Sequence, residues 1–238
     1  SNYGVIIGSG AGVTIQNTGS GSILVHGTGR SNGSGTDNNG IRINAGALIS
    51  TNSGSLNMQG YGSTSGTSIS GDFGIYMYNG GNITSTSGAI TLTGVGGNGT
   101  TGLRTASAAA AVNTIGGGSG AITLITDAIS FSSTSLSTTG TLTAYSYTNR
   151  GISVGSSVSS TLNLSNATLA TMTAGSYIFG SLVNGDGSAH TNDLTINTTR
   201  DFGNANVTFI SGQDIILAGT LTKATGAGAA TYVLQANR

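Results

Sequence analysis

The chain has 238 residues with seven basic and seven acidic side chains, so its net charge is zero, and it contains no proline, cysteine or tryptophan. The absence of cysteine excludes disulfides, zinc-thiolate sites and thiol nucleophiles. Lys223 is the only lysine, so we expect no extended cationic face for phosphate backbones, and neither nucleic-acid binding nor attachment to an anionic membrane. No apolar run approaches the roughly 18 residues that a spanning helix needs, so we expect no membrane insertion.

The composition favours a folded all-β protein. The chain has 42 glycines and many serines, threonines and asparagines, and glycine costs about 1 kcal/mol at a helical position while the others are poor helix formers. Hydrophobic residues make up 36% of the chain, which is too many for a disordered chain without net charge.

Two short phrases alternate along the first half of the chain and predict its strands. The first reads GVIIGSGAGVTI from Gly4, and variants of it begin at Gly40, Gly74 and Gly102. The second reads GSILVHGTG from Gly21, and variants begin at nearly even intervals, at Gly54, Gly88 and Gly120. Each repeat therefore predicts three short strands, with an aliphatic residue in the middle strand at Val13, Leu48 or Ile83. The opening glycines predict corners, where φ is positive or no side chain fits.

Apolar residues alternate within each second phrase, as at Ile90 and Leu92. A period of two buries one face of a strand and leaves the other in water. Three such strands cannot bury their apolar face alone, so the repeats must stack. The sequence therefore predicts a right-handed parallel β-helix with about 33 residues and three strands per coil, and roughly seven coils in all. A β-propeller is the less favoured alternative, because the chain lacks the turn signals and aromatic markers of propeller blades.

The repeat spacing becomes less regular beyond Thr126, but stretches with the same alternating strand pattern continue. Further alternating stretches begin with TGTLTAYSY at 139–147 and RGISVGSSV at 150–158 and continue to Thr222. We therefore expect one continuous solenoid over residues 1–238, with regular repeats at 1–126 and less regular coils at 127–238. The segment 181–193, SLVNGDGSAHTND, is predicted to be an extruded loop.

The repeat units resemble a known family. The units G-x-I-x-L-x-G and G-I-x-I resemble the β-strand repeats of filamentous haemagglutinin-type adhesins, the exoproteins of bacterial two-partner secretion and related autotransported proteins. The resemblance is closest at LNLSNATLATMTAGSYIFGS (162–181) and extends to SGQDIILAGTLT (211–222) and the ending TYVLQANR. It implies a non-enzymatic extracellular or bacterial cell-surface fibre that adheres or builds structure. The chain resembles an interior or carboxy-terminal piece of such a shaft, with other copies or adjacent segments joined end to end as its partners.

Some parallel β-helices are polysaccharide-active enzymes that use clustered carboxylates, which makes such an enzyme the least favoured alternative. The seven aspartates are scattered, and Asp186 with Asp193 and His190 forms the strongest catalytic candidate. Asn184, Asp186 and Ser188 have the alternate spacing of a calcium loop, but no glutamate completes the set. We therefore predict ordinary loop residues here, with no catalytic residue, no metal and no cofactor.

Two tyrosine pairs suggest glycan binding as another alternative. Alternate spacing places Tyr76 with Tyr78, and Tyr145 with Tyr147, on one face of a strand. Outward rings could stack on sugars, whereas inward rings would fill a widened core, which is the favoured prediction. Together with the loop residues above, the candidate ligand contacts are Tyr145, Tyr147, Asn184, Asp186 and His190.

Outward threonines suggest ice binding as a further alternative. Thr91 and Thr93 are predicted to face water, but the aligned pairs Asn57/Gln59 and Thr123/Ile125 break the threonine ladder after one rung. His26, Arg42 and Arg104 also alternate outward. We predict that His26 is an exposed surface residue and no metal ligand, and that Arg42 and Arg104 are charges that keep a neutral surface soluble.

Overall fold

The computed structural model describes residues 2–8, 12–30, 37–64, 71–97, 99–108, 111–156, 158, 161–198, 200–221 and 230–237. Lys223 lies outside the described residues. In the described part the fold is all-β except for one helix of five residues, α1 (Asn166–Ala170), and the strands form four parallel sheets.

The sheets are named A to D, and their strands are given in spatial order. Sheet A contains β1 (Val5–Ile7), β4 (Ile41–Ile43), β7 (Ile75–Tyr78), β10 (Leu103–Ala106) and β13 (Ile129–Ser130). Sheet B contains β18 (Met172–Thr173), β14 (Thr134–Thr138), β11 (Asn113–Gly118), β8 (Asn82–Ser85), β5 (Leu48–Thr51) and β2 (Thr14–Asn17). Sheet C contains β23 (Tyr232–Ala236), β21 (Asn206–Ser211), β19 (Ser176–Gly180), β15 (Thr141–Tyr145), β12 (Ile122–Thr126), β9 (Ile90–Val95), β6 (Leu56–Tyr61) and β3 (Ile23–Thr28). Sheet D contains β17 (Thr161–Ser165), β16 (Gly151–Gly155), β20 (Leu194–Ile196) and β22 (Ile215–Leu217).

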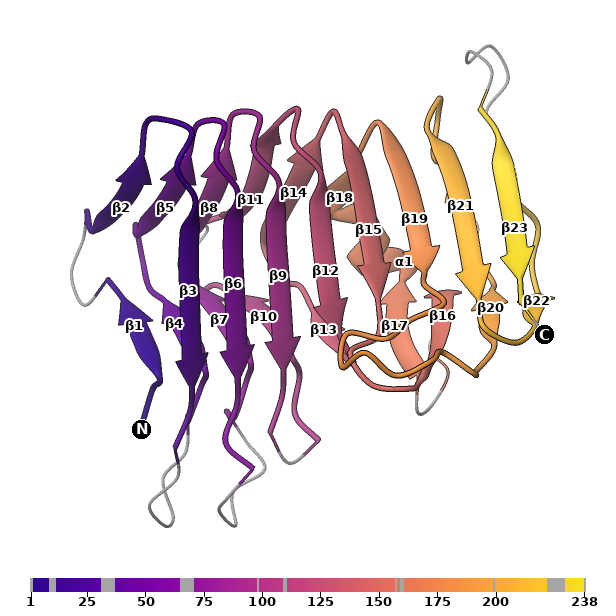
Figure 1. The fold of residues 1–238 in the computed structure, drawn as a ribbon, viewed down its shortest axis with the longest axis horizontal. Coiled ribbons are helices and arrows are strands. Elements are labelled where there is room, and N and C mark those ends of the chain that lie inside the picture. The colour runs from indigo at the N-terminus through magenta and orange to yellow at the C-terminus, as the bar shows by residue number, and fades with distance from the viewer. Residues whose placement is uncertain are drawn as a thin grey trace.

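The chain visits sheets A, B and C in turn from β1 to β15. Beyond β15 the rotation changes, because β16 and β17 are consecutive strands of sheet D. Figure 1 shows the strands of sheet C side by side along the long axis, from β3 near the amino terminus to β23 near the carboxyl terminus. These regularly stacked parallel strands are consistent with a β-solenoid.

The register shows which repeated residues are stacked. In sheet C, Ile23 pairs with Leu56, Leu56 with Ile90, and Ile90 with Ile122, and these partners recur at nearly even intervals along the chain. The next pair, Ile122 with Leu142, is joined by a clearly shorter stretch of chain. The strand connections therefore vary in length while the pairing continues.

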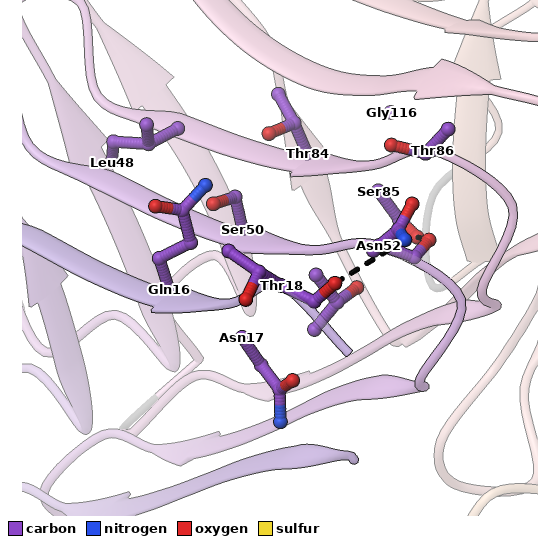
Figure 2. A pocket seen from close by; sticks show the side chains of 11 residues that line it. Gln16, Asn17, Thr18, Leu48, Ser50, Asn52, Thr84, Ser85, Thr86 and Gly116 are labelled. Carbon is purple, nitrogen blue, oxygen red and sulfur yellow. Dashed lines mark hydrogen bonds between the residues drawn. The ribbon is translucent and has the colours of Figure 1, made fainter. Parts of the chain in front are cut away.

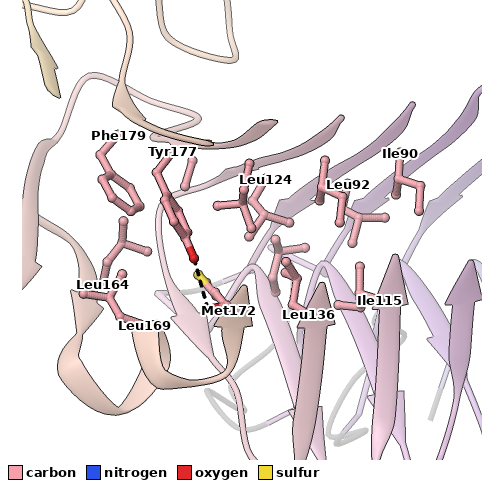
Figure 3. Packing of buried hydrophobic residues seen from close by; sticks show 14 of the residues in the cluster. Ile90, Leu92, Ile115, Leu124, Leu136, Leu164, Leu169, Met172, Tyr177 and Phe179 are labelled. Carbon is pink, nitrogen blue, oxygen red and sulfur yellow. Dashed lines mark hydrogen bonds between the residues drawn. The ribbon is translucent and has the colours of Figure 1, made fainter. Parts of the chain in front are cut away.

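Alternating apolar side chains form the core, as the sequence predicted. Ile90, Leu92, Ile122 and Leu124 are almost fully buried, and each contributes about 1.5–3 kcal/mol of burial free energy. In Figure 3 Ile90, Leu92 and Leu124 lead toward Tyr177 and Phe179 of β19. Phe179 lies beside Leu164, and the Tyr177 hydroxyl donates to the carbonyl of Met172. Tyr177 and Phe179 stack with ring centroids 5.8 Å apart, so the later rungs are filled by aromatic side chains.

The predicted aliphatic position of the middle strand is wrong in two repeats. The inward row of sheet B pairs Ile15 with Ile49 and Ile49 with Ile83, whereas Val13 precedes β2 and Leu48 is only partly buried. The stretch between the opening glycine and the inward isoleucine is longer before Ile15 than before Ile49. The two extra residues lie in the polar link, so the nine-residue spacing that leads from Gly40 to Ile49 leads from Gly4 to Val13. Leu48 is wrong for a different reason, because it lies one position before Ile49 and therefore on the other face of the strand.

The corner glycines of the second phrase lie in one stack. A Cβ on Gly54 would overlap the carbonyl oxygen of Gly21, one on Gly88 would overlap that of Gly54, and one on Gly120 would overlap that of Gly88. None of these four glycines has a positive φ. Glycine is therefore required at Gly54, Gly88 and Gly120 because each of these rungs lies too close to the one before it for a side chain.

Candidate functional site

The loop 181–193 contains three of the predicted contact residues and folds back over the end of β15. The amide of Gly185 donates to the carbonyl of Ser146 at 3.1 Å, and that of Asp186 donates to the carbonyl of Tyr147 at 2.9 Å. Val183 and Ala189 form an antiparallel bridge across the loop. The loop is thus anchored to the sheet on which the two tyrosines lie.

Asn184 is a structural centre of this loop. Its side chain accepts a hydrogen bond from Ser146 Oγ at 3.2 Å and donates to Ser188 Oγ and to the carbonyl of Ala189, both at 3.1 Å. Because Asn184 is only 4% exposed, its amide shapes the loop.

His190 joins three segments of the chain. The imidazole is 3% exposed, its Nε2 lies 2.7 Å from the carbonyl oxygen of Arg150, and the amide of Gly212 donates to its Nδ1 at 3.2 Å. A carbonyl can only accept and an amide can only donate, so the ring is the neutral Nε2-protonated tautomer. Both nitrogens are therefore used in holding the backbone, and neither is free for acid–base catalysis.

The two loop carboxylates have separate structural roles. Asp186 is exposed, and its Oδ1 accepts from the hydroxyl of Ser188 at 2.6 Å and from its amide at 2.8 Å. These hydrogen bonds hold the pKa of Asp186 below its ordinary value, so the carboxyl stays ionised and is unsuited to act as a general acid. Asp193 Oδ1 instead accepts from the amide of Asp214.

The residues with calcium-loop spacing hydrogen-bond to one another. Ser188 donates to Asp186 and accepts from Asn184, which uses the oxygens that a cation would need. Across the residues that the structure describes, no three histidine or acidic side chains gather as metal ligands. The geometry of the loop is explained by its internal hydrogen bonds.

The tyrosine pairs point outward, which corrects the favoured prediction of inward rings. In β7, Ile75 and Met77 are buried, so Tyr76 and Tyr78 lie on the opposite face and are partly exposed. In β15 the buried residues are Leu142 and Ala144, so Tyr145 is also on the outer face. Alternation alone does not say which alternate set is buried; pairing with the neighbouring strands decides it.

Tyr145 and Tyr147 differ in their surroundings. Tyr145 packs against the edge of the core, and burial raises its pKa. Tyr147 lies beyond the end of β15, with its ring 6.1 Å from that of Tyr61 in an edge-on arrangement. Burial raises the pKa of Tyr147, and its hydrogen bond with Tyr61 adds to that rise. These rings are fixed by packing, so only part of each is open to a ligand.

A polar groove runs across the outer side of sheet B. Figure 2 shows Gln16, Ser50 and Thr84 along it, and these residues are register partners on β2, β5 and β8. Asn52 donates to the carbonyl of Thr18 at 3.3 Å. The lining contains hydroxyls and amides but no charged or aromatic side chain, so it supplies hydrogen bonds without a nucleophile–base pair or a stacking surface.

No protein-family model, curated protein or solved structure matches this chain. In the described part of the chain, no helix has the length and hydrophobicity required to span a membrane.

The outward threonine row is longer than predicted. Thr91 pairs with Thr123, and Thr123 pairs with Thr143, so three successive rungs carry a threonine. Counting by the earlier spacing misses Thr143, because the connection that leads to this rung is shorter than the earlier ones. Thr93 is buried, contrary to prediction, and its partner on the next strand is Ile125. The outward hydroxyls therefore form a single row and no flat array.

Proposed function

We propose that this chain is a non-enzymatic structural and adhesive segment of an extracellular or bacterial cell-surface fibre. The finer architecture we propose is a right-handed β-helix with about 33 residues and three strands in each regular coil. The resemblance to filamentous haemagglutinin-type shafts supports this proposal. So does the engagement of His190, Asp186 and Asp193 in hydrogen bonds that shape the loop.

The observation that carries the proposal is the open core at the carboxyl-terminal end. Leu234 of β23 pairs with the buried Phe209, and Leu217 of β22 pairs with the buried Ile196, so both leucines belong to inward rows. They are nevertheless 53% and 54% exposed, because no further described rung covers them. An apolar rung left in water favours the addition of another rung.

The amino-terminal end offers a matching surface. Ile15 belongs to the inward row of sheet B yet is 37% exposed. The end strand β3 of sheet C has a described neighbour on one side only, so it presents a row of backbone groups for pairing. We propose that the partner is an adjacent solenoid segment or a second copy stacked end to end, because a head-to-tail contact propagates into a fibre.

Sedimentation over a wide concentration range tests this assembly. We expect concentration-dependent association that is weakened at least tenfold by Leu234→Asp, which places a charge in the contact. Val183→Asp is the matched control, because Val183 is equally exposed but lies in the loop over β15. A wild-type chain that stays monomeric throughout, or equal effects of both variants, would contradict end-to-end assembly.

A further inference from the structure

The outer face of sheet A carries an alternating row of arginine and tyrosine. Arg42 of β4 pairs with Tyr76 of β7, and Tyr76 pairs with Arg104 of β10. Neighbouring strands are about 4.8 Å apart, so the two arginine backbones lie roughly 9.6 Å apart on either side of the tyrosine. The sequence contains a signal for this row, since each residue follows the opening glycine of its phrase by two positions.

Aromatic rings hold both guanidinium groups in place. The Arg42 Cζ lies 5.2 Å, 5.4 Å and 5.7 Å from the ring centroids of Tyr3, Tyr76 and Tyr78. The Arg104 Cζ lies 4.6 Å from the centroid of Phe73 and 5.9 Å from that of Tyr76. These distances lie within the roughly 6 Å range of cation–π attraction. The charges are therefore positioned before any ligand arrives.

Hydrogen bonds orient one of these groups further. Arg42 Nη1 donates to the hydroxyl of Tyr3 at 2.6 Å, and Nε donates to Asn44 Oδ1 at 2.8 Å. A guanidinium has five N–H donors in a planar fork, so Arg42 keeps further donors for a ligand. Among the described residues, the buried Nε of Arg104 has no hydrogen-bond partner.

The row carries more positive than negative charge. Neither arginine forms an ion pair with any described residue. The ion pair found in the described part of the chain joins Arg150 and Asp127, which lie outside the row. Burial raises the pKa of Tyr76. The positive charges of Arg104 and Arg42 oppose that rise, and the nearby Asp37 carboxylate adds to it. Two guanidiniums and one carboxylate thus act on the Tyr76 hydroxyl, on a chain with no net charge.

We propose that the face formed by Arg42, Tyr76, Tyr78 and Arg104 binds a carboxylate-bearing sugar, such as a uronic-acid unit of an acidic glycan. A guanidinium fork matches both oxygens of a carboxylate, and the partly exposed tyrosine rings present apolar surface for a pyranose ring. This inference rests on the proposed function, for which it supplies the adhesive ligand.

The position of the row favours a glycan over an acidic peptide. An extended peptide adds to a sheet through an unpaired edge strand, whereas β4, β7 and β10 are interior strands of sheet A. A ligand can therefore contact the side chains of this face, and the backbone groups of these strands are already paired. The rings of Tyr76 and Tyr78, 5.8 Å apart, form the apolar part of that surface.

Calorimetric titration with oligogalacturonate tests the proposal, with its fully methyl-esterified form as the matched uncharged ligand. We expect binding that weakens with salt and falls at least tenfold for the ester and for the double variant Arg42→Gln/Arg104→Gln. Arg150→Gln, which removes a charge outside the row, should bind like the wild type. Thermal melting checks that each variant is folded. The double variant Arg42→Lys/Arg104→Lys keeps the positive charge but loses the planar guanidinium fork, so it should also bind more weakly than the wild type.

Each contrary outcome overturns the proposal. Absence of wild-type binding, equal binding of the ester, or unchanged binding by both double variants removes the site. Tighter binding of a sulfated galactan of equal charge removes the assignment to carboxylate. Sedimentation of the same variants separates the two proposals, because the row lies on a side face and its loss should leave end-to-end association unchanged.

Discussion

At the scale of single residues, close backbone approach decides which side chains the corners accept. Gly21, Gly54, Gly88 and Gly120 were predicted as corners, and none has a positive φ. At Gly54, Gly88 and Gly120 the backbone of the preceding rung leaves no space for a Cβ, whereas at Gly21 a Cβ would meet only the side chain of Asn17. A repeated glycine in a strand phrase therefore marks the stacking of one rung on the next.

Gly88→Ala tests this stacking. The new methyl group would overlap the carbonyl oxygen of Gly54, so the rungs must shift, and we expect a loss on the order of 1–3 kcal/mol in the free energy of unfolding. Gly19→Ala is the control, because its Cβ would meet only Asn17 Oδ1 at an ordinary 3.6 Å. Urea denaturation measures both variants, and equal stabilities would show that the corner has room.

His190 shows the limit of residue-type reasoning. A histidine between two aspartates in one loop is a reasonable catalytic candidate, yet its ring binds the backbone of Arg150 and Gly212. These partners lie 40 and 22 residues away in sequence. Only the fold brings them to the ring, so the sequence alone had no means of predicting this role.

At the scale of elements, the alternation within each strand is the property that sequence predicts best. Ile90 and Leu92 are buried while Thr91 between them is partly exposed. The prediction fails where the polar link changes length, as before Ile15, or where both alternate sets are apolar or aromatic, as with Tyr145 and Ala144. In such cases pairing with the neighbouring strands decides which face is buried.

A pair of aspartate substitutions tests the ladder of β9. Ile90→Asp would bury an unpaired charge between Leu56 and Ile122, and we expect a loss of more than about 3 kcal/mol in the free energy of unfolding. Thr91→Asp, at the next position on the outer face, should cost less than about 1 kcal/mol. Thermal and chemical denaturation compare them, and a stable Ile90→Asp variant would contradict the stacked core.

At the scale of the whole molecule, the chain is nearly one-dimensional, because each strand pairs with the strand before and after it in its sheet. In such an array, stability is roughly a sum over units and their nearest-neighbour interfaces. The central strands have two neighbours, while β3 and β23 each have one described neighbour. The ends are therefore the least stable part and also the surface that we propose for assembly.

Hydrogen exchange tests both properties together. In dilute protein we expect amides of β3 and β23 to exchange faster than those of β9 and β12, because fraying begins at the ends. At high concentration the end strands should become protected if they pair with another copy. Uniform exchange along the solenoid would contradict the one-dimensional picture, and end strands that stay unprotected would count against assembly.

The sequence by itself determined the all-β class, the parallel stacking and most of the buried positions, because period-two alternation and repeated glycines are local properties of each rung. Only the tertiary structure decided which distant residues meet. It placed Tyr76 between Arg42 and Arg104, extended the threonine row to Thr143, and closed the loop 181–193 over Tyr147. The physical reason is that glycine-rich links vary in length at little cost, so the register between rungs depends on the pairing of whole strands.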